Sequence, residues 1–107
     1  MPQPSPRVLA RILEVAHQAL PPRGRLWLYG SRARGDAQPD SDWDLLILLD
    51  KPRIEQRDYD EVLYPFTYLG WDIDENISPV LYTNEEWTRC AFLPFHKNVE
   101  HDKIELV

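Results

Sequence analysis

The sequence predicts a small α/β domain in which helices cover both faces of a sheet. Residues 45–49 are five consecutive aliphatic residues without alternation, which is typical of a strand buried on both faces. Apolar residues between Val8 and Ala19 recur at helical spacing, which indicates an amphipathic helix. With 107 residues, 43% of them hydrophobic, the chain can bury one modest core. We therefore expect a single domain over residues 1–107.

The first helix and the first strand have clear boundaries. Ser5 followed by Pro6 is a good N-cap and first-turn pair, and the helix should run to about Leu20. The sequence Pro-Pro-Arg-Gly at residues 21–24 ends it, because proline cannot continue the helical hydrogen bonds and glycine frees the turn. Residues 25–29 then form the first strand.

A short helix at residues 32–35 and a polar link at residues 36–41 should lead to the second strand. That strand is predicted at residues 43–49, where the aliphatic run lies. The residues Asp50, Lys51 and Pro52 stop it.

The second half of the chain predicts another helix and another strand. Apolar residues between Ile54 and Leu69 approximate a helical face, which Pro65 should kink or interrupt. Gly70 is the natural terminator of this helix. A third strand is expected at about residues 76–82.

The last quarter begins with a capping signal. Thr83 and Glu86 have the spacing of a capping box, so a helix should run through residues 87–92. Pro94 breaks the chain again, and residues 95–105 form either a last short helix or an extended tail.

Charge and composition exclude several classes of function. Twelve basic and eighteen acidic residues give a net charge of −6, which argues against non-specific binding of nucleic acid. The lone Cys90 cannot form an intramolecular disulfide. No apolar segment approaches the roughly 20 residues of a membrane span, and the N-terminus lacks the pattern of a signal peptide. We expect a cytoplasmic protein without a membrane partner.

Two aspartates one residue apart, Asp42 and Asp44, predict a metal site. Alternate residues of a strand point to the same side, about 6.6 Å apart along the strand axis, so the two carboxylates can converge. At about 5 Å, two such charges repel by roughly 3 kcal/mol at an effective dielectric constant of 20, and a bound cation reverses that sign. Mg²⁺ suits the pair because it takes oxygen ligands and shares its coordination shell with substrate phosphates.

Gly30 and Ser31, ten residues before Asp42, predict the phosphate-binding turn beside that metal. Glycine permits close approach of the backbone, serine offers a hydroxyl, and a helix beginning there turns free amides toward an anion. Arg32 and Arg34 add positive charge, although exposed arginines are common without such a role. Arg34 is the better candidate for a phosphate contact, because it lies inside the loop next to Gly35.

The pattern of Gly30-Ser31, ten residues and Asp42-Trp43-Asp44 resembles the signature of the polymerase-β-like nucleotidyltransferase superfamily, and the chain looks like its minimal nucleotidyltransferases, the MNT proteins. Residues 78–83 and 94–99 are also similar to stretches of bacterial MNT proteins. The resemblance implies a mixed sheet flanked by helices and Mg²⁺-dependent transfer of a nucleoside monophosphate, AMP from ATP, to an acceptor. Asp42 and Asp44 are then the catalytic metal ligands, and Gly30, Ser31 and Arg34 bind the nucleotide. It also implies a HEPN-domain toxin as the partner and acceptor, with this chain as the antitoxin.

One departure from the superfamily pattern leaves the activity open. The superfamily usually supplies a third carboxylate from a neighbouring strand, where this sequence has Ser78. Asp72, Asp74 and Glu75 lie just before it, and Asp74 shares a face with Ser78 if the strand begins earlier. The alternative function is therefore a catalytically weak or inactive antitoxin that neutralises its partner by binding. Modification of a small molecule is a weaker alternative, because such enzymes usually carry an additional helical domain.

The second half is rich in aromatic residues. Most of them should belong to the core, and the remainder would form an exposed patch for a partner chain. The residues concerned are Tyr64, Phe66, Tyr68, Trp71, Trp87, Phe92 and Phe95.

Overall fold

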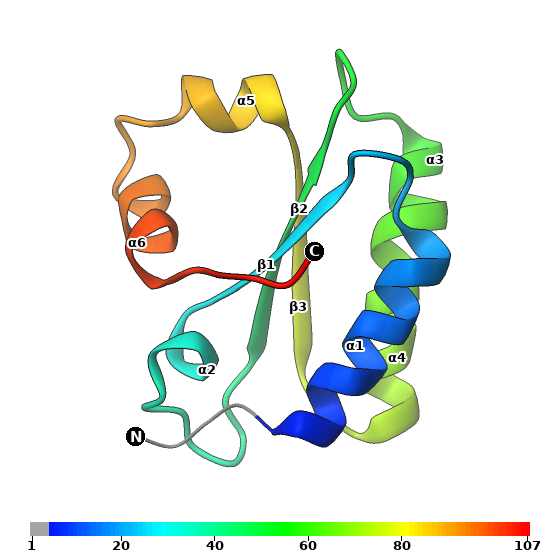
Figure 1. The fold of residues 1–107 in the computed structure, drawn as a ribbon, viewed down its shortest axis with the longest axis vertical. Coiled ribbons are helices and arrows are strands. Elements are labelled where there is room, and N and C mark those ends of the chain that lie inside the picture. Colours follow the sequence, from blue (N-terminus) through cyan, green and yellow to red (C-terminus); the bar gives the residue numbers. More distant parts are fainter. Residues whose placement is uncertain (1–4) are drawn as a thin grey trace.

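The computed structural model describes residues 5–107 and contains a four-stranded mixed sheet (Figure 1). The strands are β1 (Arg25–Tyr29), β2 (Trp43–Leu49), β3 (Ile77–Thr83) and β4 (Ile104–Glu105), in the order β3-β2-β1-β4. β1 pairs antiparallel with β2 and β4, whereas β2 and β3 are parallel. The predicted α/β class with a mixed sheet is confirmed.

Helices cover both faces of the sheet (Figure 1). One face carries α1 (Pro6–Ala19), α3 (Gln56–Asp58), the π-helical turn η1 (Tyr59–Leu63) and α4 (Tyr64–Ile73). The other face carries α5 (Asn84–Arg89) and α6 (Pro94–Asp102), and the short α2 (Ser31–Arg34) follows β1. This arrangement buries β2 from both sides.

The residues of β2 alternate between two hydrophobic clusters. Trp43 and Leu45 are fully buried against α1 and α4, where they contact residues such as Phe66. Leu46 and Leu48 point to the other face and pack with the residues of α5 and α6 that are buried there. The aliphatic run therefore serves two cores, which is why it shows no alternation of polar and apolar residues.

The helix expected at residues 54–69 differs from the prediction at both ends. It begins at Gln56, after a capping box in which Glu55 is the N-cap, and it continues to Ile73. Pro65 lies in the first turn of α4, where a missing amide proton costs little, and the irregular π turn comes before it. Gly70 does not end the helix, because Asp74 does so in the left-handed conformation with φ 56°.

Gly70 has a packing role instead of the predicted terminal one. It is buried, and a Cβ atom there would approach the carbonyl oxygen of Glu75 to 2.7 Å. The chain returns toward β3 over this glycine, and the amide of Glu75 donates a hydrogen bond of 2.9 Å to the Gly70 carbonyl. Close approach of backbone is therefore the reason for glycine at this position.

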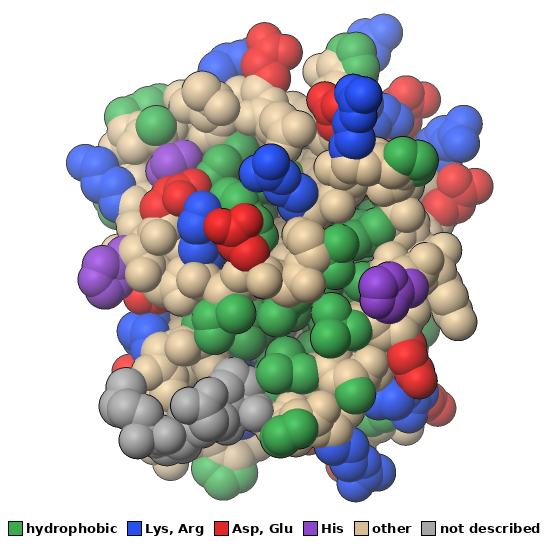
Figure 2. Space-filling view, viewed as in Figure 1, with side chains coloured by type: hydrophobic (Ala, Val, Ile, Leu, Met, Phe, Trp, Pro, Cys, Tyr) green, Lys and Arg blue, Asp and Glu red, His purple; other side chains and the backbone are tan. Residues whose placement is uncertain are grey.

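The C-terminal quarter confirms the capping signal and adds a strand. The Thr83 hydroxyl accepts a hydrogen bond from the Glu86 amide, and the Glu86 side chain accepts one from the Thr83 amide. Residues 94–102 form a helix, and the two-residue strand β4 pairs with β1, which the sequence did not predict. In the view of Figure 2, hydrophobic side chains gather near the middle of the molecule, and charged side chains lie around the edge and in the upper half of the view.

Within residues 5–107, no helix is both long and apolar enough to cross a membrane.

Candidate nucleotide and metal site

The sheet brings the predicted site residues together through its register. Because β1 and β2 are antiparallel, Tyr29 at the end of β1 pairs with Asp44 near the start of β2. Gly30 follows Tyr29 directly and so lies beside Asp44. The parallel pairing of β2 with β3 places Ser78 opposite Asp44 on the other side. The turn, the two aspartates and Ser78 thus come from three adjacent strands.

Gly30 is in contact with the carboxylate of Asp44. It has φ 75° and ψ −157°, a conformation that is essentially restricted to glycine, and it caps the N-terminus of α2. A Cβ atom on Gly30 would collide with Oδ2 of Asp44. Glycine is therefore required both by the backbone conformation and by the approach of the turn to the carboxylate. The turn that is predicted to bind phosphate therefore lies against one of the two aspartates that are predicted to bind a metal ion.

The two aspartates repel each other, and this repulsion indicates a site for a cation. Asp42 is exposed immediately before β2, whereas Asp44 is half-buried. Burial raises the pKa of Asp44 above its usual range, the charge of Asp42 raises it further, and Arg34 opposes both effects. Ser78 donates a hydrogen bond of 3.1 Å from Oγ to Oδ2 of Asp42. A divalent cation at this point would relieve the repulsion.

The oxygen atoms at the site fit Mg²⁺ that shares its coordination with a nucleotide. In the described part of the chain, no group of three or more His, Cys, Asp and Glu side chains could hold a metal ion. The donors are the carboxylates of Asp42 and Asp44 and the hydroxyl of Ser78. One or two carboxylates completed by phosphate oxygens and water is a common shell for Mg²⁺, whereas zinc prefers nitrogen and sulfur ligands.

Within the described residues, none of the three acidic candidates for a third carboxylate forms a metal-binding group with Asp42 and Asp44, although Glu75 lines a hollow beside Asp42. Asp74 ends α4 in the left-handed conformation, so the proposal that it shares a face of β3 with Ser78 is wrong, because β3 begins only at Ile77. Asp72 pairs with Arg11 at 3.2 Å. Glu75 accepts a hydrogen bond of 2.8 Å from the indole of Trp43.

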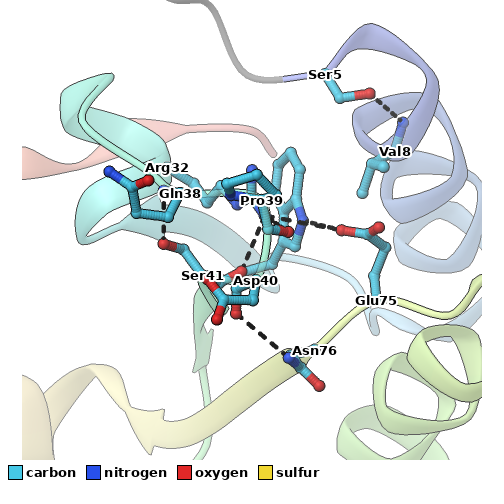
Figure 3. Close-up of polar contacts among 10 residues, drawn as sticks. Ser5, Val8, Arg32, Gln38, Pro39, Asp40, Ser41, Glu75 and Asn76 are labelled. Atoms are coloured by element: carbon cyan, nitrogen blue, oxygen red, sulfur yellow. Dashed lines mark hydrogen bonds and ion pairs between the residues drawn. The ribbon is translucent and has the colours of Figure 1, made fainter.

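Arg32 is hydrogen-bonded to the loop between α2 and β2. Its guanidinium donates to the carbonyl oxygens of Pro39 and Ser41 at 3.2 and 3.0 Å (Figure 3). The guanidinium also lies 4.8 Å from the ring centroid of Trp43. The side chain is only 15% exposed, and its nearest carboxylate is Glu75 at 3.9 Å.

Arg34 lies one turn after Ser31, on the same side of α2. It is therefore better placed than Arg32 to contact a phosphate bound at Ser31. It is 45% exposed, and its charge acts on Asp44. It donates from Nε to Asp36 at 3.2 Å and from Nη1 to Asp102 at 2.8 Å. Sequence reasoning missed Asp102, which lies 68 residues away and has no local signal of a link to the loop.

A hollow of about 190 Å³ lies beside Asp42 at the edge of the sheet. Ser78 from β3 and Thr67 and Trp71 from α4 contribute to its walls. Trp71 is 74% exposed and ends a row of exposed aromatic rings along η1 and α4, whose centroids are 5.5–6.4 Å apart. The row consists of Tyr59, Tyr64, Tyr68 and Trp71. The prediction that most of the aromatic residues of the second half belong to the core is wrong, because only Phe66 and Trp87 are buried, whereas Tyr64, Tyr68, Trp71 and Phe92 are exposed.

The comparisons with solved structures agree with the fold. A crystal structure of a toxin–antitoxin complex with AMP-PNP is 16% identical over 92% of this chain and 72% of that chain, with a TM-score of 0.66. The toxin–antitoxin complex MntA-HepT is 14% identical over 96% and 72%, with a TM-score of 0.61. A structure of the tri-AMPylated HEPN toxin of Shewanella oneidensis in complex with its MNT antitoxin is 14% identical over 92% and 68%, with a TM-score of 0.56.

A comparison with curated proteins found no matching sequence. The family model for a nucleotidyltransferase domain matches residues 9–104, which includes every residue of the candidate site. The match agrees with the presence of the Gly30-Ser31 turn after β1 and of Asp42 and Asp44 at the start of β2. The chain belongs to the nucleotidyltransferase domain family.

Proposed function

We propose that this protein transfers AMP from ATP, with Mg²⁺, to a side-chain hydroxyl of a HEPN-domain partner and thereby acts as its antitoxin. The approach of Gly30 to the carboxylate of Asp44 carries the proposal, because it joins a phosphate turn to a metal pair. The similar structures support the choice of nucleotide and partner, since one contains AMP-PNP and another a tri-AMPylated HEPN toxin with an MNT antitoxin.

Each residue of the site has a role in this reaction. The amides at the start of α2 and the hydroxyl of Ser31 bind the β- and γ-phosphates, and Arg34 adds a positive charge beside them. Asp42 and Asp44 hold Mg²⁺, which neutralises the negative charge that develops on the phosphates when it is bound. The arrangement orients the α-phosphorus for attack and stabilises the leaving pyrophosphate.

The order of the strands indicates the side from which the acceptor arrives. In an in-line displacement, the attacking oxygen and the leaving pyrophosphate lie on opposite sides of the α-phosphorus. The phosphate turn follows β1, so the pyrophosphate lies on that side of Asp44. The acceptor hydroxyl then comes from the β3 side, where the hollow beside Asp42 and Ser78 lies open to solvent. Its oxygen bonds to the α-phosphorus, and its proton leaves to water.

A second candidate function is supported by Ser78. This residue occupies the position opposite Asp44 where a third carboxylate would help to accept the proton of the acceptor. A serine hydroxyl is a much weaker base. The alternative is an antitoxin that has retained the nucleotidyltransferase fold but neutralises its partner through contact alone.

Transfer of a radiolabel distinguishes these functions. The purified chain is mixed with Mg²⁺, ATP labelled at the α-phosphate, and the protein encoded by the neighbouring gene. The enzyme predicts labelling of that protein, which Asp42→Asn abolishes. Asp72→Asn is the control, because Asp72 is an exposed carboxylate paired with Arg11, outside the site.

The alternative predicts the opposite pattern. No protein becomes labelled, and the two proteins form a tight complex whose affinity is unchanged by Asp42→Asn. That result would exclude the transferase activity while leaving the antitoxin role intact.

A further inference from the structure

Arg34 is held between two carboxylates that differ in their surroundings. Asp36 is only two residues away and is 62% exposed, so its ion pair with Arg34 is weakened by water and salt. Asp102 is 8% exposed and comes from the far end of the described chain. Its hydrogen bond from Arg34 is also the shorter of the two, at 2.8 Å against 3.2 Å. Asp102 is therefore the contact that fixes the guanidinium.

The carboxylate of Asp102 does not stabilise the helix that it ends. Asp102 is the last residue of α6, where a carboxylate is unfavourable because the helix C-terminus already carries partial negative charge. Burial also raises its pKa, but hydrogen bonds from His101 and Arg34 outweigh burial and leave the pKa below its usual range. The carboxylate thus stays charged in a place where only its partners stabilise it.

The two ion pairs leave part of Arg34 free. A guanidinium has five N–H donors, and the structure uses one at Nε for Asp36 and one at Nη1 for Asp102. Three donors remain for an anion. Arg34 also lies close enough to Asp44 to oppose the increase in the pKa of that residue, so its charge acts at the metal pair.

We propose that Asp102 is a positioning residue that holds Arg34 ready to contact the triphosphate. This inference rests on the proposed function. An unrestrained arginine loses side-chain freedom when it binds a ligand, whereas one already held by Asp102 loses less. The last turn of α6 thereby contributes to nucleotide binding although it lies outside the Gly30–Asp44 segment. Asp102 itself needs no contact with the nucleotide.

The test measures binding of ATP with Mg²⁺ by titration calorimetry. We expect Asp102→Asn to raise the Kd about tenfold, which corresponds to about 1.4 kcal/mol. The matched control is Asp58→Asn. Asp58 is 9% exposed and pairs with Lys51 at 2.7 Å, so it is equally buried and equally close to its cation, but it lies at α3. Its substitution should leave the Kd unchanged.

A double-mutant cycle shows whether Asp102 acts through Arg34. Arg34→Ala should weaken binding, and adding Asp102→Asn to it should have no further effect. The NMR signals of the Arg34 Nη1 protons give a readout without nucleotide, because the hydrogen bond to Asp102 protects these protons from exchange and Asp102→Asn should broaden their signals. Should Asp102→Asn fail to fold, Arg34→Lys replaces it, since an ammonium group cannot hold both carboxylates in the same way and should raise the Kd similarly.

The outcomes separate this inference from the proposed function. A wild-type protein that binds ATP while Asp102→Asn binds it equally well or more tightly would overturn the positioning role alone. The same holds if the effect of Asp102→Asn persists in the Arg34→Ala background, or if Arg34→Lys binds like the wild type. A wild-type protein that binds no ATP with Mg²⁺ would overturn the proposed function and this inference with it.

Discussion

Substitution of Gly30 by alanine tests whether the phosphate turn and the metal pair form one site. Two effects add. The conformation of Gly30, φ 75° and ψ −157°, costs a residue with a Cβ atom about 1–3 kcal/mol. The new methyl group would also collide with Oδ2 of Asp44 and displace the carboxylate from its place in the site. We therefore expect lower stability and a separate loss of ligand affinity.

The size of the second effect follows from what Gly30 does. It contacts a metal ligand without being one, and removal of such a supporting contact typically costs about 10- to 100-fold in metal affinity. We expect the Kd for ATP with Mg²⁺ to rise by about that factor in Gly30→Ala, measured by calorimetry at a temperature where the variant remains folded. Urea denaturation should show a loss of about 1–3 kcal/mol in the free energy of unfolding.

The variant Gly35→Ala distinguishes the effect of backbone strain from the effect of the collision with Asp44. Gly35 has φ 89° and ψ 14° at the other end of α2, so alanine there introduces strain at another left-handed position. We expect a similar loss of stability and a smaller change in the Kd. If Gly30→Ala binds ATP with Mg²⁺ as tightly as the wild type, or no more weakly than Gly35→Ala, then the contact with Asp44 does not organise the site and the reasoning is refuted.

Three further predictions concern other parts of the molecule. Ser78→Asp, which restores an acid opposite the metal pair, should increase the rate of labelling severalfold, and an unchanged or lower rate would show that the missing carboxylate does not limit the reaction. Trp71→Ala should weaken labelling of the partner through KM, whereas Phe92→Ala, which is also 74% exposed, should not, and equal effects would exclude the acceptor side assigned to the hollow. Burial raises the pKa of Asp58, but Lys51 and the backbone amide of Glu55 outweigh burial and leave this pKa below its usual range. The charged carboxylate therefore contributes its full stabilisation above the pKa of an unfolded aspartate, and this stabilisation is lost as the pH falls through the lower pKa of the folded state. Urea denaturation from pH 7 to pH 3 should show this loss in the wild type and not in Asp58→Asn, and parallel profiles would contradict it.

The parts of the fold that the sequence predicts are those set by local pattern. The aliphatic run of β2 predicts burial on both faces, and the structure shows two clusters on its two sides. The capping box of Thr83 and Glu86 predicts the start of α5 to the residue. Such signals depend on residues close together in the chain, so they hold without knowledge of the tertiary structure.

Packing and pairing contacts, which a local sequence pattern does not show, decided the features that the sequence did not predict. Gly70 has the composition of a helix terminator, but the returning chain at Glu75 packs over it and the helix continues beneath. β4 has only two residues and exists because β1 offers it a partner. The candidate site shows the same difference between local and tertiary signals. Its motif, Gly30 to Asp44, lies within fifteen residues and can be recognised in the sequence, whereas Asp102 contacts Arg34 from α6 and cannot.

The central claim is that Gly30, Ser31, Asp42 and Asp44 form one site for a metal-bound nucleotide. A crystal structure with Mn²⁺ and a non-hydrolysable ATP analogue tests it most directly, because the anomalous signal of manganese locates the metal independently of the fitted atoms. We predict a peak bound by the carboxylates of Asp42 and Asp44, with phosphates on the amides at Ser31. A metal ion or a triphosphate bound elsewhere, with these residues unoccupied, would contradict the claim.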